Sequence, residues 1–246
     1  METPALPPPL SLNDLLSASP VALFLDFDGT LIEIASGPDA IEAPSDIAQR
    51  LTALAQRLNG RLALISGRGL DNIEQHIGTL DFARAGSHGA ERIDGTGRRL
   101  GPVPQALDGD TIEALRYLAA QHDALYEAKR HGAALHYRSV PDKGPAIEEA
   151  ASALARQSGL IAKRGKCVIE IIRPGADKGS ALAAFMRISP FTDSVPVFIG
   201  DDVTDEDGFI AAKRLGGFGI AVGERPSDNA DFKLDTVKDV HAWLTL

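Results

Sequence analysis

Two aspartates, Asp26 and Asp28, stand two residues apart at the end of an apolar run and just before Gly29. The run predicts a strand over residues 21–27 that is buried on both faces of a parallel sheet. Because an ionised carboxylate without a partner is costly to bury, this position favours a chemical role over a stabilising one. The spacing lets both carboxylates serve one site, and Gly29 lets a ligand approach the backbone.

Polar residues also follow three other predicted elements. Ser66 comes directly after the apolar run 61–65 and before a predicted helix start, where free backbone N–H groups attract anions. Lys178 lies just before another predicted helix, and the acidic segment 200–206 follows the apolar run 195–199. Ligands of open α/β sheets bind beyond the carboxyl ends of the strands, so we expect these groups at one edge. Carboxylates, a lysine and a serine together favour a site for Mg²⁺ and phosphate.

Each of these groups also has a plainer interpretation. The two aspartates can form an acidic turn, and Ser66 can simply cap a helix. Lys178 can be a solvated helix residue, and the acidic residues 201–206 suit the positive end of a helix dipole. Four such coincidences in this order are hard to attribute to chance, so we favour one shared site.

The elements that must position these residues alternate between strand and helix at both ends of the chain. This order is typical of an α/β fold, a Rossmann-like parallel sheet with right-handed crossovers. The predicted strands cover residues 21–27, 61–65, 195–199 and 218–222, and residues 82–89 are expected to form a short strand that runs into a glycine-flanked loop. The predicted helices cover residues 10–16, 44–58, 69–77, 180–186, 204–213 and 237–246.

The middle of the chain has a different order, helix-strand-strand-helix-strand-strand. It predicts a small antiparallel sheet with two helices on one face, an inserted α+β module. His131 and Gly132 are expected to join two of its strands as a β-hairpin. We therefore expect a discontinuous core, residues 1–105 and 174–246, and an insert of residues 106–173. The helices of the insert are predicted over residues 110–120 and 146–157, and its strands over residues 124–130, 133–139, 160–163 and 167–172.

Composition narrows the class of protein. The chain has 246 residues, a formal charge of −9 and one cysteine, Cys167. The negative charge and the lack of a basic stripe argue against a nucleic-acid partner, and a single cysteine fits a reducing compartment. No stretch has the pattern of a signal peptide or the length of a membrane span. We expect a cytoplasmic monomer that acts on a small molecule and has no membrane partner.

Four motifs resemble those of the haloacid dehalogenase-like (HAD) phosphatases. They are Asp26-Phe27-Asp28-Gly29-Thr30-Leu31, Ser66-Gly67-Arg68, Lys178 and Gly200-Asp201-Asp202-Val203-Thr204-Asp205-Glu206. The insert resembles the α/β cap, of the C2 type, of one HAD subclass. Residues 86–91, 127–138 and 173–179 are similar to the trehalose-6-phosphate phosphatase family. The resemblance implies a Mg²⁺-dependent hydrolase of trehalose biosynthesis that dephosphorylates trehalose 6-phosphate through an aspartyl-phosphate.

The resemblance also implies a role for each residue at the strand ends. Asp26 would be the nucleophile, and Asp28 would act as general acid and then general base. We expect neighbouring carboxylates to crowd Asp28 and favour its protonated form. Ser66 and Lys178 would bind the phosphoryl oxygens, and Asp205 would hold Lys178 or waters. The implied ligands of Mg²⁺ are the carboxylates of Asp26 and Asp201 and the backbone carbonyl of Asp28, with Asp202 ranked behind Asp201.

Substrate specificity is expected from the insert. Glu170 interrupts the apolar run 168–172, where a carboxylate needs a hydrogen-bonding partner such as a sugar hydroxyl. Glu127 and Lys129 share a strand face, and His136 and Arg138 are expected to do the same on the next strand. The plainer interpretation is an exposed, ion-paired sheet face. By resemblance, the substrate would be bound by Glu127, Lys129, Arg138 and Glu170 of the insert and by Arg68, His88 and Gly89 of the core.

Three other functions stay open at this point. A phosphatase of the same subclass could act on sucrose phosphate or mannosyl-3-phosphoglycerate. A phosphomutase would return the phosphoryl group to a sugar instead of water. A non-catalytic sugar-phosphate sensor is disfavoured by the presence of both Asp26 and Asp28, because a binding protein needs no acid/base pair.

Overall fold

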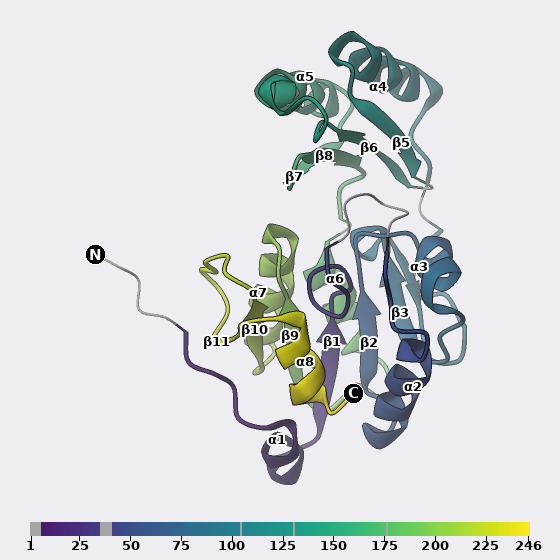
Figure 1. The fold of residues 1–246 in the computed structure, drawn as a ribbon. Coiled ribbons are helices and arrows are strands. Elements are labelled where there is room, and N and C mark those ends of the chain that lie inside the picture. The colour runs from purple at the N-terminus through teal and green to yellow at the C-terminus, as the bar shows by residue number, and fades with distance from the viewer. Residues whose placement is uncertain (1–5, 35–40, 104, 130, 176) are drawn as a thin grey trace. The chain divides into compact units, whose positions relative to one another are not determined.

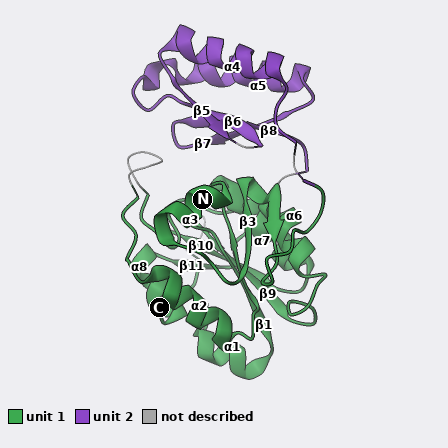
Figure 2. Cartoon of the chain, turned by 90° about the vertical axis from the view of Figure 1, so that its right-hand side faces the viewer, with its two compact units in different colours: residues 1–102, 177–246 green, residues 103–176 purple. Residues whose placement is uncertain are grey.

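The computed structural model describes residues 6–34, 41–103, 105–129, 131–175 and 177–246. They form two compact units, residues 1–102 with 177–246, and residues 103–176 (Figure 2). The first unit is discontinuous in sequence because the second is inserted between its two parts. The role of the second unit as a cap stays a prediction. None of the helices in the described ranges combines the length and apolar character needed to cross a membrane.

The first unit is built on one sheet. Its strands are β1 (Val21–Leu25), β2 (Leu62–Ile65), β3 (Ala83–Gly86), β4 (Glu91–Ile93), β9 (Val195–Gly200), β10 (Phe218–Val222) and β11 (Phe232–Leu234). Their order is β11-β10-β9-β1-β2-β3-β4 (Figure 1). All neighbours are parallel except β3 and β4, which are antiparallel. The central strand β1 pairs Leu25 with Leu64 on one side and with Ile199 on the other, so the ends of three strands meet there.

Helices cover both faces of this sheet because its strands are apolar on both sides. Along β1, Leu23 and Leu25 belong to one buried cluster, and Ala22 and Phe24 belong to the other. This double burial explains why the run shows no alternation of polar and apolar residues. The first cluster includes α1 (Leu12–Ala18), α2 (Ile47–Arg57), α3 (Leu70–Ile77) and α8 (Val237–Leu244), and the second includes α6 (Lys178–Phe185) and α7 (Glu206–Arg214).

The second unit is a four-stranded antiparallel sheet with two helices on one face. Its elements are α4 (Gly109–His122), β5 (Leu125–Lys129), β6 (Gly132–His136), α5 (Gly144–Gln157), β7 (Ile161–Gly165) and β8 (Val168–Ile172). The strand order is β5-β6-β8-β7. Leu135 and Ile169 pack with Leu115 of α4 and Ile147 of α5 in one apolar core. The other face of this sheet carries the charged residues considered below.

The predicted class, an α/β core with an inserted α+β module, is confirmed, and the differences are local. The predictions missed β4 and β11, which have only three residues each and lie at the two edges of the sheet. The predicted hairpin connection is wrong, because Gly132 pairs with Lys129 inside the ladder and only His131 of the predicted pair lies in the connection. Its other residue, 130, lies outside the described ranges. Strand β6 ends at His136, so Arg138 follows the strand instead of lying on its face.

Candidate active site

The strand ends bring Asp26 and Asp201 together. The N–H of Asp26 donates to the carbonyl of Ile199, at 2.9 Å, which continues the pairing of β1 with β9 past the end of β1. Gly29 has a φ of +80°, and a Cβ built there would lie 2.1 Å from Oδ2 of Asp201. The turn after β1 therefore requires glycine both for its backbone conformation and for the close approach of this carboxylate.

Lys178 is the first residue of α6 and joins two of the carboxylates. Asp177 and Ser180 form a capping box around it, which fixes where the helix begins. Its Nζ lies 2.7 Å from Oδ1 of Asp26 and 2.6 Å from Oδ1 of Asp205, and all three side chains are buried. Asp205 therefore holds Lys178, which is one of the two partners predicted for it, and Lys178 also contacts Asp26, the proposed nucleophile.

The cluster has more carboxylate groups than positively charged groups. Oxygens of Asp26, Asp201 and Asp205 lie within 4.8 Å of one another, and Lys178 supplies one ammonium group. Burial and then the Asp205 carboxylate raise the pKa of Asp26 well above its ordinary value, although Lys178 opposes this shift. Burial alone lowers the pKa of Lys178, but Asp205 and Asp26 outweigh it and raise the pKa above its ordinary value. The lysine thus stays charged, and the remaining negative charge favours the binding of a further cation.

Asp201 has the properties of a metal ligand. Its Oδ1 is buried and has no hydrogen-bond partner among the described residues. Burial, followed by the charge of Asp205, raises the pKa of Asp201 to about 7. Both oxygens of Asp205 already accept hydrogen bonds, from Lys178 at 2.6 Å and from the N–H of Asp202 at 2.9 Å. A cation therefore fits Asp201 and Asp26 best, since hard divalent ions prefer carboxylate oxygens.

Asp28 forms an ion pair with a guanidinium group, a partner that the sequence did not predict, and its crowding by neighbouring carboxylates stays a prediction. Arg68 donates from Nε to Oδ2 of Asp28 at 2.6 Å and from Nη2 to Oδ1 at 2.8 Å. Arg68 also donates to Asn72 of α3, at 2.8 Å, and this contact fixes the position of its guanidinium group. The Asp28 side chain is 30% exposed, against 5% for Asp26. The two aspartates therefore occupy different environments, as an acid/base group and a nucleophile require.

Ser66 lies at the end of β2 but not directly before a helix, because α3 begins only at Leu70 and is capped at Gly69. Its buried hydroxyl accepts a hydrogen bond from the N–H of Arg68, at 3.1 Å. Its carbonyl accepts from the N–H of His88, at 2.9 Å. The structure thus places Ser66 beside the segment that contains His88, and the helix-cap interpretation is wrong.

The segment of Ser87, His88 and Gly89 is strained and closely packed. All three residues have positive φ values, between 51° and 93°. A Cβ at Gly67 would lie 2.7 Å from the His88 ring. Arg92 donates from Nε to the carbonyl of Gly89, at 2.7 Å, and from Nη2 to Ser180 of α6, at 2.9 Å. This segment therefore connects the second motif to the start of the helix that carries Lys178.

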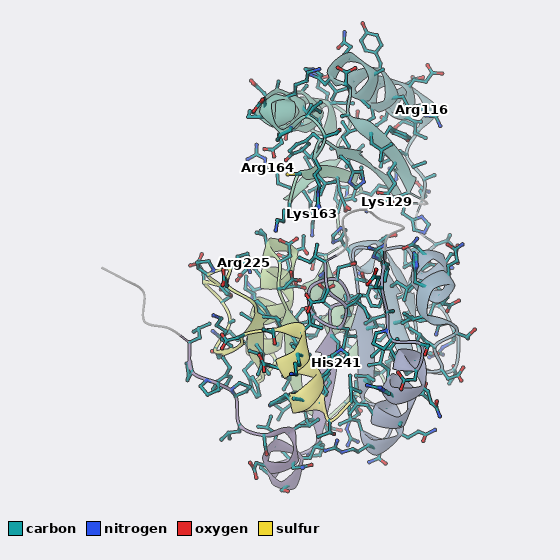
Figure 3. The ribbon with its side chains drawn as sticks, in the orientation of Figure 1. Arg116, Lys129, Lys163, Arg164, Arg225 and His241 are labelled. Atoms are coloured by element: carbon teal, nitrogen blue, oxygen red, sulfur yellow. The ribbon has the colours of Figure 1, made fainter. Side chains whose placement is uncertain are left out.

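In the inserted unit, the predicted substrate residues other than Arg138 lie on one sheet face. The register places Glu127, Ala134, Glu170 and Lys163 in one row across the four strands. Lys129 forms an ion pair with Glu170. Figure 3 shows Lys129 and Lys163 on the side of the sheet away from α4 and α5. Arg138 is exposed and follows this face in a turn.

His136 of the same face lies 2.7 Å from Glu127. These contacts give the face a fixed pattern of donors and acceptors. The ion pairing of the plainer interpretation is therefore correct, but the side chains of Lys129 and Glu170 are only 15% and 14% exposed, so the face is not fully exposed. The assignment of these residues to substrate binding stays a prediction.

Sequence reasoning missed the loop after β10. Arg225 of this loop donates to backbone carbonyls of Asp201 and Asp202, at 3.0 and 3.1 Å. The available signal was its position shortly after the predicted strand 218–222, whose carboxyl end lies beside that of β9.

Two solved structures share the fold of this chain. The C-terminal domain of a trehalose-6-phosphate phosphatase from C. albicans superposes with a TM-score of 0.81 at 21% identity, over 99% of this chain and 100% of that chain. A phosphatase of the haloalkanoate (HAD) superfamily from Bacteroides thetaiotaomicron gives a TM-score of 0.60 at 18% identity, over 94% of this chain and 95% of that one. The chain therefore has the fold of these two phosphatases. A family model described as trehalose-phosphatase matches residues 24–238, and the chain belongs to this family.

Similarity in sequence agrees with this assignment. The chain is 41% identical over 241 residues to the trehalose-6-phosphate phosphatase of Escherichia coli strain K12, covering 97% of this chain and 90% of that protein. It is 39% identical over 206 residues to a probable trehalose-phosphate phosphatase of Sinorhizobium fredii, covering 82% and 77%. These relatives are named as phosphatases, and the protein is a phosphomonoester hydrolase.

Proposed function

We propose that the protein hydrolyses trehalose 6-phosphate to trehalose and inorganic phosphate in a Mg²⁺-dependent reaction of trehalose biosynthesis. The observation that carries the proposal is the contact of buried Asp26 with Lys178, beside Asp201, in a chain of the trehalose-phosphatase family. The names of the relatives supply the substrate. The single cysteine, Cys167, fits a reducing compartment, and we place the reaction in the cytoplasm.

In the first step, a carboxylate oxygen of Asp26 attacks the phosphorus atom and the bond from phosphorus to the sugar oxygen breaks. Asp28 gives a proton to that leaving oxygen, and its partial exposure lets it reach substrate. Lys178 places a fixed positive charge beside the transferring phosphoryl group. The products of this step are free trehalose and a phosphorylated Asp26.

In the second step, water attacks phosphorus and releases Asp26 and phosphate. Asp28, now ionised, takes the proton of the attacking water. Ser66 is proposed to bind a phosphoryl oxygen. A Mg²⁺ held by the carboxylates of Asp26 and Asp201 and the backbone carbonyl of Asp28 would neutralise phosphate charge.

Recognition of the sugar is assigned to the inserted unit, which acts as the cap. The charged sheet face offers carboxylates that accept from hydroxyl groups and ammonium groups that donate to them. Glu127, Lys129, Arg138 and Glu170 are the proposed contacts on this unit, and Arg68, His88 and Gly89 are those on the core.

The test is phosphate release from a panel of phosphorylated sugars, with Mg²⁺ and with EDTA. The proposal predicts the highest kcat/KM for trehalose 6-phosphate and none of this activity in EDTA. Faster release from sucrose phosphate or mannosyl-3-phosphoglycerate would assign another substrate. Isomerised sugar phosphate without free phosphate would indicate a mutase, and binding without turnover would indicate a sensor.

A further inference from the structure

Arg225 contacts the backbone of the proposed metal-binding loop from the neighbouring strand end. It lies in the loop after β10, and Figure 3 labels it in the first unit. Its Nε donates to the carbonyl of Asp201 at 3.0 Å, and its Nη2 donates to the carbonyl of Asp202 at 3.1 Å. Two successive peptide groups are thus held by one planar guanidinium group, which has little freedom to tilt.

Arg225 is itself held by a partly buried partner. Its Nη2 lies 2.6 Å from Oε1 of Glu206, whose side chain is 17% exposed. The other oxygen, Oε2, accepts from the backbone N–H and the side-chain amide of Asn229, at 3.2 and 2.9 Å. Burial raises the pKa of Glu206, but hydrogen bonds from Arg225 and Asn229 outweigh this effect and hold the pKa below its ordinary value. Glu206 is therefore a fixed anion that orients the guanidinium group.

This network acts on Asp201, the residue whose Oδ1 is buried without a hydrogen-bond partner among the described residues. Gly29 lies against the same carboxylate, because a Cβ built there would lie 2.1 Å from Oδ2. Among the described residues, no group donates a hydrogen bond to Oδ1 and aims it, so the direction of this oxygen depends on where the backbone of Asp201 is held. Arg225 supplies that hold at the carbonyl of the same residue.

We propose that Arg225 is a positioning residue that sets the affinity of the site for Mg²⁺ by fixing the backbone of Asp201. The inference rests on the proposed function, because it takes Asp201 as a metal ligand. Groups that orient a metal ligand commonly change metal affinity about 10–100-fold when they are lost. A role limited to holding two loops together would instead lower stability and leave the dissociation constant for Mg²⁺ unchanged.

The test compares wild type with Arg225→Lys by calorimetric titration of Mg²⁺ into metal-free protein without substrate. Lysine keeps the charge but cannot reach both carbonyls and Glu206 in one plane. The dissociation constant for Mg²⁺ is expected to rise about tenfold or more. At saturating Mg²⁺, KM for trehalose 6-phosphate should stay within twofold of the wild-type value. Arg50→Lys is the matched control, since Arg50 pairs with Asp46 in an exposed i, i+4 contact on the surface.

An unchanged dissociation constant in Arg225→Lys overturns the inference, whatever its melting temperature. If that variant does not fold, the same titration is made with Glu206→Gln, which keeps the side-chain size and removes the charge that holds Arg225. It should weaken Mg²⁺ binding in the same direction, and wild-type affinity would overturn the inference. Wild type that releases no phosphate from trehalose 6-phosphate would instead contradict the proposed function, so the two failures are distinguishable.

Discussion

Nζ of Lys178 lies 2.7 Å from Oδ1 of Asp26, and the two side chains are only 3% and 5% exposed. A buried ion pair of this kind is costly to break from one side, because the remaining charge has neither water nor a partner. The relationship makes Lys178 a requirement for the folded core, in addition to its proposed role in binding phosphate.

Replacing Lys178 with methionine should therefore destabilise the metal-free protein by roughly 3–5 kcal/mol at pH 8. Asp26 and Asp205 are then left buried beside each other without a cation. Urea unfolding in EDTA measures the loss. Lys213→Met removes an ion pair with Asp231 whose side chains are 42% and 31% exposed, and should cost less than about 1 kcal/mol. Equal losses in the two variants would show that the buried contact is not special.

The pH dependence of stability should run in the opposite direction to that of ordinary carboxylates. Asp201 has a pKa raised from 3.8 to about 7, and Asp26 is raised as well. Below pH 4 both the folded and the unfolded chain hold these protons. The contribution of the raised pKa values to the free energy of unfolding is therefore at its maximum there. Between pH 4 and 7 only the folded protein holds the proton of Asp201, so stability falls by up to about 1.4 kcal/mol per pH unit.

Unfolding in EDTA between pH 5 and 8 measures this slope, and Asp201→Asn should reduce it. The variant should also be more stable than wild type at pH 8 without metal, and Mg²⁺ should no longer stabilise it. Wild-type stability that rises with pH over this range would contradict the assignment of a raised pKa.

Much of this site follows from the sequence because a parallel sheet brings the ends of its strands together. The apolar runs before Asp26, Ser66 and Asp201 were enough to place their strands, and the order of the elements placed them at one edge. The partner of Asp28 was not predictable, because the contact with Arg68 depends on side-chain conformation across 40 positions in sequence.

The structural features that were missed have a common physical cause. Strands β4 and β11 are too short to show an alternation of polar and apolar residues, and tertiary contacts alone define them. Arg225 donates to backbone carbonyls, which every residue type has, so the sequence of the loop that it holds does not indicate the contact. Arg138 falls outside β6 because a strand end depends on pairing, here with β8, and not on its own residues.

Gly29→Ala tests the close approach of the first strand end to Asp201. The added Cβ would lie 2.1 Å from Oδ2 of Asp201, so the carboxylate must move. We expect the stabilisation by Mg²⁺, measured as the rise in melting temperature, to be lost. Gly97→Ala is the control, since its φ is +84° and no atom lies within 4 Å of an added Cβ. It should cost only about 1–2 kcal/mol of backbone strain and keep the full response to Mg²⁺.

Glu170→Ala tests the assignment of the charged sheet face to the sugar. Loss of a hydrogen bond to a charged group, roughly 1.5 kcal/mol, should raise KM for trehalose 6-phosphate about tenfold. KM for an aryl phosphate, which has no sugar, should stay the same. Arg164 on the adjacent strand points to the opposite face, where it pairs with Glu148 at 3.0 Å, so Arg164→Gln should change neither value. Equal losses on both substrates for Glu170→Ala would argue against sugar recognition here.

The most direct measurement of the central claim is chemical trapping of the phosphorylated residue during turnover. Borohydride reduces an acyl phosphate to an alcohol, so phosphorylated Asp26 becomes homoserine, which peptide mass spectrometry locates. With trehalose 6-phosphate and Mg²⁺ we expect homoserine at position 26, and none in Asp26→Asn or without substrate. Turnover that leaves residue 26 unmodified while another residue is reduced would contradict the account.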